Sequence, residues 1–163
     1  MRFTYLVNIE DLDKTYQRFE KRTKYAIKKC RENVYISDDI DEFNRLHLLS
    51  RPDRKIDFDF IKKTYLERQP NCRIYATETA MAMISWDKEE NKKAIGYYLL
   101  AGRNTTIKPD NSPSKILWEA MKDLNKIGIN EIDLCGANKP NIELFKRGFS
   151  GKKVPQIEPC LKY

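Results

Sequence analysis

The segment "NIELFKRGFSGKKV", residues 141–154, carries two adjacent cations, Lys146 and Arg147, in a setting that suits charge stabilisation. The apolar residues of this segment recur at helical spacing: Ile142, Phe145 and Phe149. A short amphipathic helix with a glycine stop and a solvated basic edge accounts for this pattern. The alternative is that the cations face a reaction centre, or a phosphate beside it. The surrounding elements must decide between the two interpretations.

The composition predicts one globular domain, residues 1–163, with a basic surface. The 163 residues suffice for a single well-filled core, and 40% of them are hydrophobic. The formal net charge is +7, from 31 Lys and Arg against 24 Asp and Glu. This excess favours acidic, phosphate-bearing partners.

Neither a metal site nor a disulfide framework is expected from the cysteines. They lie far apart in the chain: Cys30, Cys72, Cys135 and Cys160. There is no C-x-x-C pair, and His47 is the one possible imidazole ligand, so a zinc site is not predicted. No secretion signal and no apolar run of roughly 20 residues is found. We therefore expect a reduced, cytoplasmic protein without a membrane span.

Several enzyme classes are excluded by missing motifs. The single histidine, His47, lies between Leu46 and Leu48, a position typical of a satisfied, partly buried imidazole rather than of a catalytic base. There is no Walker lysine loop and no G-x-G-x-x-G fingerprint. Kinase, NTPase and dehydrogenase chemistry is therefore not predicted.

The N-terminal region predicts a strand followed by a long basic helix. Residues 2–9 alternate as a strand, and from about Asp11 to Arg31 apolar residues recur every three or four positions. Lysines and arginines fill the other faces of this helix. They form either a solvated surface or a phosphate-binding surface, in which Arg22 and Lys28 are candidate contacts.

The remaining pattern predicts further helices around a mixed sheet. A short strand, "NVYIS", precedes a helix with an Asp39–Glu42 capping box, and a third helix ends at Pro70. Three strand-like runs then predict an antiparallel meander: "CRIYAT", "AMAMISW" and "AIGYYLLA". The last elements are a helix with Ser112 as N-cap and Pro113 in its first turn, the strand "NEIDLC", the helix of the opening segment, and a terminal strand in 152–163.

This order of elements is similar to the GNAT-like (acyl-CoA N-acyltransferase) fold. That fold is α+β, with a central mixed, mostly antiparallel sheet flanked by helices. An acyl donor and an amine meet in it where two central strands part. In this chain the similarity places "NEIDLC" beside the last strand of the meander.

The residues resemble more narrowly the Fem-type (FemAB-like) peptidoglycan aminoacyltransferases. The segment "YQRFEKRTKYAIKKCRENVYI" is similar to the basic helix and strand that lead into their catalytic domain. The segment "KILWEAMKDLNKIGINEIDLCGANKPNIELFKRGFSGKKV" resembles their C-terminal signature, with Trp118, the D-x-x-G of Asp133–Gly136 and the F-K-x-x-F of Phe145–Phe149. Members of the family add residues to cell-wall precursors from aminoacyl-tRNA. Single-domain, acetyltransferase-like relatives also occur.

The resemblance implies roles for residues near the end of the chain. Lys146 matches the family lysine that stabilises the developing charge or the departing ribose oxygen. Because a lysine acts as a base only when its pKa is depressed by burial, we assign it electrostatic work. Asp133 either accepts the amine proton or fixes its turn. The remaining candidate substrate-binding residues are Phe145, Arg147, Trp118, Tyr98, Ser112, Ser114 and Lys115.

The acyl donor is not fixed by the sequence. The coenzyme A branch of the fold has R-x-x-G-x-G/A before its central helix, where amides receive the pyrophosphate. This chain has "GRNTTIKPDNSPSK", in which Gly102 and Arg103 match, while Pro109 and Pro113 remove two amide donors. We therefore expect weak acetyl-CoA binding, although the helix start at Ser112–Lys115 can still hold an anion.

The main functional hypothesis is an N-acyltransferase of the Fem-like group with an aminoacyl or other acyl donor, acting in the synthesis of cell-wall or surface-polymer precursors. Its partners would be tRNA, CoA or a nucleotide-linked precursor, and a homo-oligomer is possible. Fem-type enzymes carry two such domains and this chain has room for one, which implies a partner subunit or a different acceptor. One alternative is acetyl-CoA-dependent N-acetylation. The other is a non-catalytic module that holds RNA or a nucleotide-linked precursor.

Overall fold

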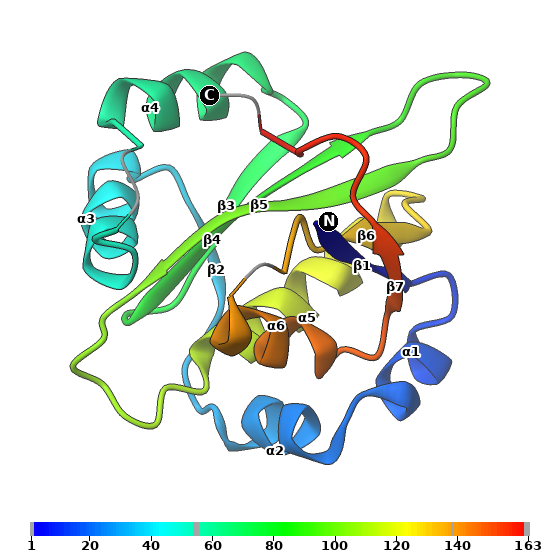
Figure 1. Cartoon of the computed structure of the whole chain (residues 1–163), viewed down its shortest axis with the longest axis horizontal. Coiled ribbons are helices and arrows are strands. Elements are labelled where there is room, and N and C mark those ends of the chain that lie inside the picture. Colours follow the sequence, from blue (N-terminus) through cyan, green and yellow to red (C-terminus); the bar gives the residue numbers. More distant parts are fainter. Residues whose placement is uncertain (1, 54–55, 138, 162–163) are drawn as a thin grey trace.

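The fold is a seven-stranded sheet with helices on both faces (Figure 1). The computed structural model describes residues 2–53, 56–137 and 139–161. The strand order is β2-β3-β4-β5-β6-β1-β7, and every neighbouring pair is antiparallel except β5 and β6, which are parallel. Helices α3 (Ile40–Ser50) and α4 (Phe58–Glu67) lie on one side of the sheet, while α1, α2, α5 and α6 lie on the other. The predicted α+β, GNAT-like arrangement is confirmed.

The predicted meander forms the centre of the sheet. It consists of β3 (Cys72–Ala76), β4 (Ala80–Asp87) and β5 (Ile95–Arg103), with the register Ala82 opposite Tyr75 and Ala101. β6 (Glu131–Asp133) lies beside β5, as expected from the sequence, and β1 (Phe3–Asn8) follows it. The short strand β2 (Tyr35–Ser37) pairs with β3 at one edge.

The long basic helix predicted from residue 11 is wrong as a single element. The chain forms α1 (Leu12–Arg18) and α2 (Lys21–Lys29), with extended backbone at Phe19 and Glu20 between them. Phe19 is 3% exposed, and its ring packs 5.1 Å from that of Phe149 and 5.4 Å from that of Trp118. The Glu20 amide donates to the Gly148 carbonyl at 2.9 Å. Burial of Phe19 therefore interrupts a pattern that is helical on either side.

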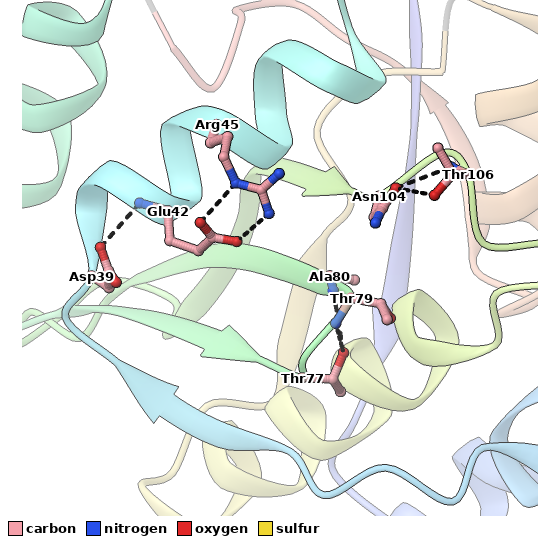
Figure 2. A network of polar contacts seen from close by, with 8 residues as sticks. All are labelled: Asp39, Glu42, Arg45, Thr77, Thr79, Ala80, Asn104 and Thr106. Atoms are coloured by element: carbon pink, nitrogen blue, oxygen red, sulfur yellow. Dashed lines mark hydrogen bonds and ion pairs between the residues drawn. The ribbon is translucent and has the colours of Figure 1, made fainter.

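The start of α3 follows the predicted cap with one difference. Asp39 accepts from the Glu42 amide at 3.0 Å, as Figure 2 shows. Glu42 does not return the bond to Asp39, because its carboxylate accepts both Nε and Nη2 of Arg45, at 2.8 and 2.6 Å. This pairing lowers the pKa of Glu42. Figure 2 also shows the turn before β4, where Thr77 Oγ1 accepts from the amides of Thr79 and Ala80.

The C-terminal half supplies the remaining elements. Helix α5 (Ser112–Lys126) buries the predicted face of Ile116, Leu117, Ala120, Met121 and Leu124. The prediction of Ser112 as its N-cap is wrong by one residue, because Asn111 is the N-cap and Ser112 is the first helical residue. Helix α6 (Pro140–Arg147) precedes β7 (Lys152–Pro155), the edge strand that pairs with β1. The predicted terminal strand is too long, because β7 ends at Pro155 and residues 156–161 are irregular. Residues 162–163 of that prediction lie outside the described residues.

The expectation of a chain without disulfides is also wrong. Cys135 and Cys160 are joined, with their Cα atoms 5.7 Å apart and a sequence separation of 25. The turn after β6 and the segment after β7 meet because both strands flank β1 in the sheet. Cys30 and Cys72 are free thiols, and burial raises the pKa of Cys72 to about 12.

Two hydrophobic clusters fill the two faces of the sheet. One lies under α5 and includes Phe19, Tyr98 and Phe149, and the other lies under α3 and includes Phe43 and Leu46. Helix α3 crosses β5 very closely at Gly102, where an added Cβ would lie 2.3 Å from the His47 backbone nitrogen. His47 is buried beside this crossing, and its Nδ1 donates to the Ala101 carbonyl at 2.8 Å.

Because the neighbour at this crossing is backbone, Gly102→Ala is expected to lower the free energy of unfolding by about 3 kcal/mol, the upper end of common overpacking costs. Gly96→Ala is the matched control, since its Cβ would meet the movable Cδ1 of Leu124 at 2.7 Å. We expect the control to cost about 1 kcal/mol in urea unfolding. Equal costs for the two variants would contradict a rigid crossing of α3 and β5.

Candidate functional site

A cavity opens where the parallel strands β5 and β6 stop pairing. The last paired residues are Tyr97 and Asp133, after which β5 continues to Arg103 with β4 as its remaining partner. The cavity has a volume of about 690 Å³ and is lined by residues 98–103 of β5 and by Cys135 and Gly136 after β6. Residues of α3 line it from one face of the sheet, and residues of α5 and α6 from the other. Two groups can therefore approach its centre from opposite faces.

Lys146 lies in the wall of this cavity and is held in place by the chain. Its side chain is buried, with the residue only 6% exposed, although it belongs to the last turn of α6. Its Nζ donates to the Gly136 carbonyl at 2.5 Å and to the Cys135 carbonyl at 3.3 Å. It also lies 5.5 Å from the centroid of the Tyr98 ring. The cation is thus positioned before any ligand arrives, as electrostatic stabilisation of a transition state requires.

Asp133 holds the turn that supplies the acceptors of Lys146. Its Oδ1 accepts from the Cys135 amide at 2.7 Å and from the Thr4 hydroxyl, and the Gly136 amide donates to Thr4 Oγ1 at 3.2 Å. Cys135 and Gly136 have φ values of 60° and 91°, so the turn runs through left-handed backbone. Of the two roles considered for Asp133, this geometry matches fixation of the turn, and Asp133 is not among the lining residues.

Aromatic residues form the floor beside Lys146. Tyr98 and Phe145 both line the cavity, with their ring centroids 6.4 Å apart, and Phe149 packs 5.4 Å behind Phe145. Burial raises the pKa of Tyr98, so its hydroxyl stays neutral and is not a base. This apolar floor lowers the local dielectric around the cation, which strengthens its interaction with developing negative charge.

Positive charge dominates the described lining of the cavity. Six cationic side chains contribute, against the single carboxylate of Asp110: Arg2, Arg51, Arg103, Lys108, Lys139 and Lys146. At one mouth Asp53 binds both Lys139 and Arg51, the latter at 3.5 Å. The hydrogen bond from Lys139 lowers the pKa of Asp53 to about 2, so this carboxylate stays charged. The lining as a whole suits an anionic ligand.

The start of α5 does not offer an open anion site. The Ser112 amide donates to Asp110 Oδ1 at 2.9 Å, and the Ser112 hydroxyl donates to Glu32 Oε2 at 3.3 Å. Lys115 reaches the Glu32 carbonyl at 2.5 Å and the Cys30 carbonyl at 3.4 Å. The anion predicted for the Ser112–Lys115 region is therefore supplied by the chain itself, and Ser114 is the polar residue of this turn that lines the cavity.

Other predicted site residues lie away from the cavity. Trp118 packs against Tyr16 and Phe19 in the core, with ring distances of 5.3 and 5.4 Å. Arg147 faces solvent and lies 3.7 Å from Glu20. Arg22 also binds Glu20, at 2.7 Å, and donates to the Leu144 carbonyl at 2.5 Å, which ties α2 to α6.

Lys28 lies on the exposed face of α2 (Lys21–Lys29), where Lys21 and Lys29 are exposed as well. This basic face of α2 is a surface separate from the cavity lining, in which none of its residues takes part among those described. The structure thus brings Lys146, Phe145, Tyr98 and Ser114 together and leaves Lys28 with the other cations of α2.

Sequence reasoning missed much of the charged lining. Arg51 follows α3, Lys108 lies in the loop after β5, and Lys139 precedes α6, so no local pattern joins them. Each is one lysine or arginine among the 31 of the chain. Only knowledge of which loops share one end of the sheet would have selected them.

One cluster of potential metal ligands occurs within residues 2–53, 56–137 and 139–161. The ligand atoms of Asp133, Cys135 and Cys160 lie within 4.8 Å of one another. The bridge engages both sulfurs, and Asp133 is used by Thr4 and the Cys135 amide. In this form the cluster does not suit a metal ion.

Known structures share the fold of this chain. A crystal structure of FemX superimposes with a TM-score of 0.79 over 93% of this chain, at 10% identity. The chain has the fold of FemX. The C-terminal domain (DUF2156) of a protein named as a lysylphosphatidylglycerol synthetase, from Agrobacterium fabrum, matches with a TM-score of 0.63 over 94% of the chain, at 16% identity. The resemblance read from the motifs is thus confirmed at the level of the fold.

The chain spans 59% of the FemX chain and 58% of the other. No protein-family model and no curated protein sequence matches it. Over the part of the chain that the structure describes, no helix combines the length and apolar character needed to cross a bilayer.

Because Asp110 and Glu32 fill the start of α5, we expect acetyl-CoA to bind more weakly than about 10 µM in titration calorimetry. The double variant Asp110→Asn with Glu32→Gln should tighten binding about tenfold, since it removes two charges from a helix N-terminus. The control Asp87→Asn with Glu89→Gln changes the net charge equally at a remote turn. Micromolar binding by the unaltered chain, about −8 kcal/mol, would contradict the self-filled site.

Proposed function

We propose that the chain is an N-acyltransferase that moves an acyl or aminoacyl group from an activated ester or thioester to an amine. The observation that carries the proposal is the buried cation of Lys146 in the wall of a cavity reached from both faces of the sheet. The fold of FemX and the motif resemblance around Lys146 support it. No protein nucleophile is needed, because the amine attacks the acyl carbon directly.

In the proposed reaction, a neutral amine enters from one face and the acyl carbonyl from the other. Attack forms the carbon–nitrogen bond and places negative charge on the carbonyl oxygen and positive charge on the nitrogen. Collapse breaks the bond from the acyl carbon to the departing oxygen or sulfur, which takes up the proton that the nitrogen loses. Lys146, fixed by the carbonyls of Cys135 and Gly136, stabilises that charge electrostatically. The neutral Tyr98 and the ring of Phe145 exclude water beside it.

An aminoacyl ester is the donor that the site favours over coenzyme A. The carboxylates of Asp110 and Glu32 occupy the helix start where a pyrophosphate would bind. The resemblance to Fem-type enzymes supports aminoacyl-tRNA as the source of such an ester. The cationic lining matches an anionic acceptor, such as a nucleotide-linked cell-wall precursor or an anionic lipid headgroup.

A thermal-shift screen tests this choice of ligand. Acetyl-CoA, a nucleotide-linked muropeptide and aminoacyl-tRNA are compared, because a ligand that binds only the folded state raises its stability. Acyl transfer to an amine is then measured with the ligands that bind. Binding of RNA or precursor without transfer under any pairing would favour the non-catalytic module.

The central catalytic prediction concerns Lys146→Met, which keeps a long flexible stem and removes the cation. Acyl transfer should fall on the order of a hundredfold in kcat with little change in KM, as for loss of one preorganised donor. Stability should fall by about 1–3 kcal/mol, because two turn carbonyls lose their donor.

Lys139→Met, in the same wall but with a side chain 47% exposed, is the matched control and should keep kcat. Thermal melts establish that both variants are folded at the assay temperature. A change in KM alone would make Lys146 a binding residue, and unchanged kinetics would return it to a structural role.

The basic face of α2 gives a second prediction, for polyanionic ligands. Lys28→Glu with Lys29→Glu should weaken tRNA binding regardless of base sequence and reduce its salt dependence. Arg22 is left intact because it anchors α6. The control Lys62→Glu with Lys63→Glu makes the same charge change on α4, on the other side of the sheet. If both pairs weaken binding equally in filter-binding titrations, net charge rather than α2 is responsible.

A further inference from the structure

The C-terminal segment forms one wall of the cavity. Residues 156–161, here called the strap, run from β7 across the end of the sheet toward α3 and α4 (Figure 1). Gln156, Pro159, Cys160 and Leu161 of the strap line the cavity. The strap therefore takes part in defining which ligands reach Lys146.

The strap is anchored at both ends and exposed between them. The Gln156 amide donates to the Arg2 carbonyl at 2.8 Å, and Leu161, 9% exposed, packs into the hydrophobic cluster of Phe43 and Leu46. Ile157 between them is 94% exposed. A segment with so little buried apolar surface gains its order from a few attachments.

The Cys135–Cys160 bridge attaches the strap directly to the turn that holds Lys146. Cys135 supplies one of the two carbonyls that bind Lys146 Nζ, and Gly136 supplies the other. Both cysteines are only half-buried and line the open cavity, so a small thiol reaches the bridge through it. The bridge thus lies where it can be reduced without unfolding of the core.

We propose that the Cys135–Cys160 disulfide is a reversible lock that holds the strap as a wall of the cavity. A thiolate of a dithiol reductant attacks one sulfur, forms a mixed disulfide and displaces the other cysteine as a thiolate, which takes up a proton. The second thiol of the reductant then closes its own disulfide and releases the first cysteine. Two electrons and two protons pass to the pair, and the reductant is oxidised.

Reduction is expected to free the strap while leaving the turn in place. The Cys135 amide still donates to Asp133, and the Gly136 amide to Thr4, and neither bond involves the bridge. Lys146 therefore keeps its two carbonyl acceptors, and reduction changes only the position of the strap in the cavity wall. Oxidised protein has a narrowed cavity, and reduced protein has one open on the side of the strap. This inference does not depend on acyl transfer being the activity.

Hydrogen exchange of the whole chain, with and without dithiothreitol, tests the lock. Reduction should raise exchange of the Gln156 amide, the strap amide whose acceptor is the Arg2 carbonyl, at least about tenfold and leave residues 133–136 and β5 within about twofold. Cys160→Ser without reductant should match the reduced protein and show no further response to it. Cys30→Ser, which alters a free, half-buried thiol, should respond like the unaltered chain.

Peptide mapping under non-reducing conditions provides the second measurement, after treatment with glutathione disulfide. A linked Cys135–Cys160 peptide is expected. Recovery of both cysteines as alkylated thiols after this treatment would overturn the proposal, as would equal exchange of the strap in oxidised and reduced protein. The mapping is repeated with Zn²⁺ added before alkylation. If Zn²⁺ protects both thiols from alkylation and no linked peptide is found, Cys135, Cys160 and Asp133 form a metal site and the lock is rejected.

Discussion

The short parallel pairing of β5 with β6 is the constraint on which the rest of the site depends. It joins Ile95–Tyr97 to Glu131–Asp133 and then ends, while β5 continues for six more residues. Because the backbone groups of β5 beyond Tyr97 have no partner from β6, a gap opens in the middle of the sheet. Helices from both faces border the gap, and the turn after β6 turns its carbonyls toward α6 and Lys146.

The two candidate anion sites, the start of α5 and the cavity, differ in how far their positive charge is compensated by acidic residues of the chain. At the start of α5 the helix dipole and the Ser112 amide are satisfied internally by Asp110 and Glu32, so that end of the helix is already neutralised. In the cavity, six cations from separate segments converge, and Asp53 pairs with two of them, Lys139 and Arg51. The cations of the cavity can therefore attract an anionic ligand. Tyr98 and Phe145 exclude water beside Lys146, which strengthens this attraction.

Most helices and strands could be predicted from the local spacing of apolar residues. The strand-forming runs of β3, β4 and β5 and the apolar stripe of α5 were readable from their residue types and spacing, and β4 is buried on both faces of the sheet. The break at Phe19 was not, since it depends on a pocket built by Trp118 and Phe149, far away in sequence.

The site was predictable only in part, for the same reason. Lys146 and Phe145 stand in a recognisable motif, but Arg51 and Lys139 reach the cavity by tertiary placement alone. The Cys135–Cys160 pair was equally hidden, because a separation of 25 residues says nothing of which strands bring the two sulfurs together. Contacts between segments that the sheet order makes neighbours lie beyond single-sequence reasoning.

The edge strand β7 has a consequence for how this domain can associate. Lys152 and Lys153 are exposed along it, and Pro155 lacks the amide that a further strand would need. Extension of the sheet across this edge would bury two lysines beside a gap in the hydrogen-bond ladder. FemX, whose chain is longer than this one, shows that the fold occurs within larger proteins. Any neighbouring domain or subunit on this side must therefore pack through side chains, and the sheet ends at β7.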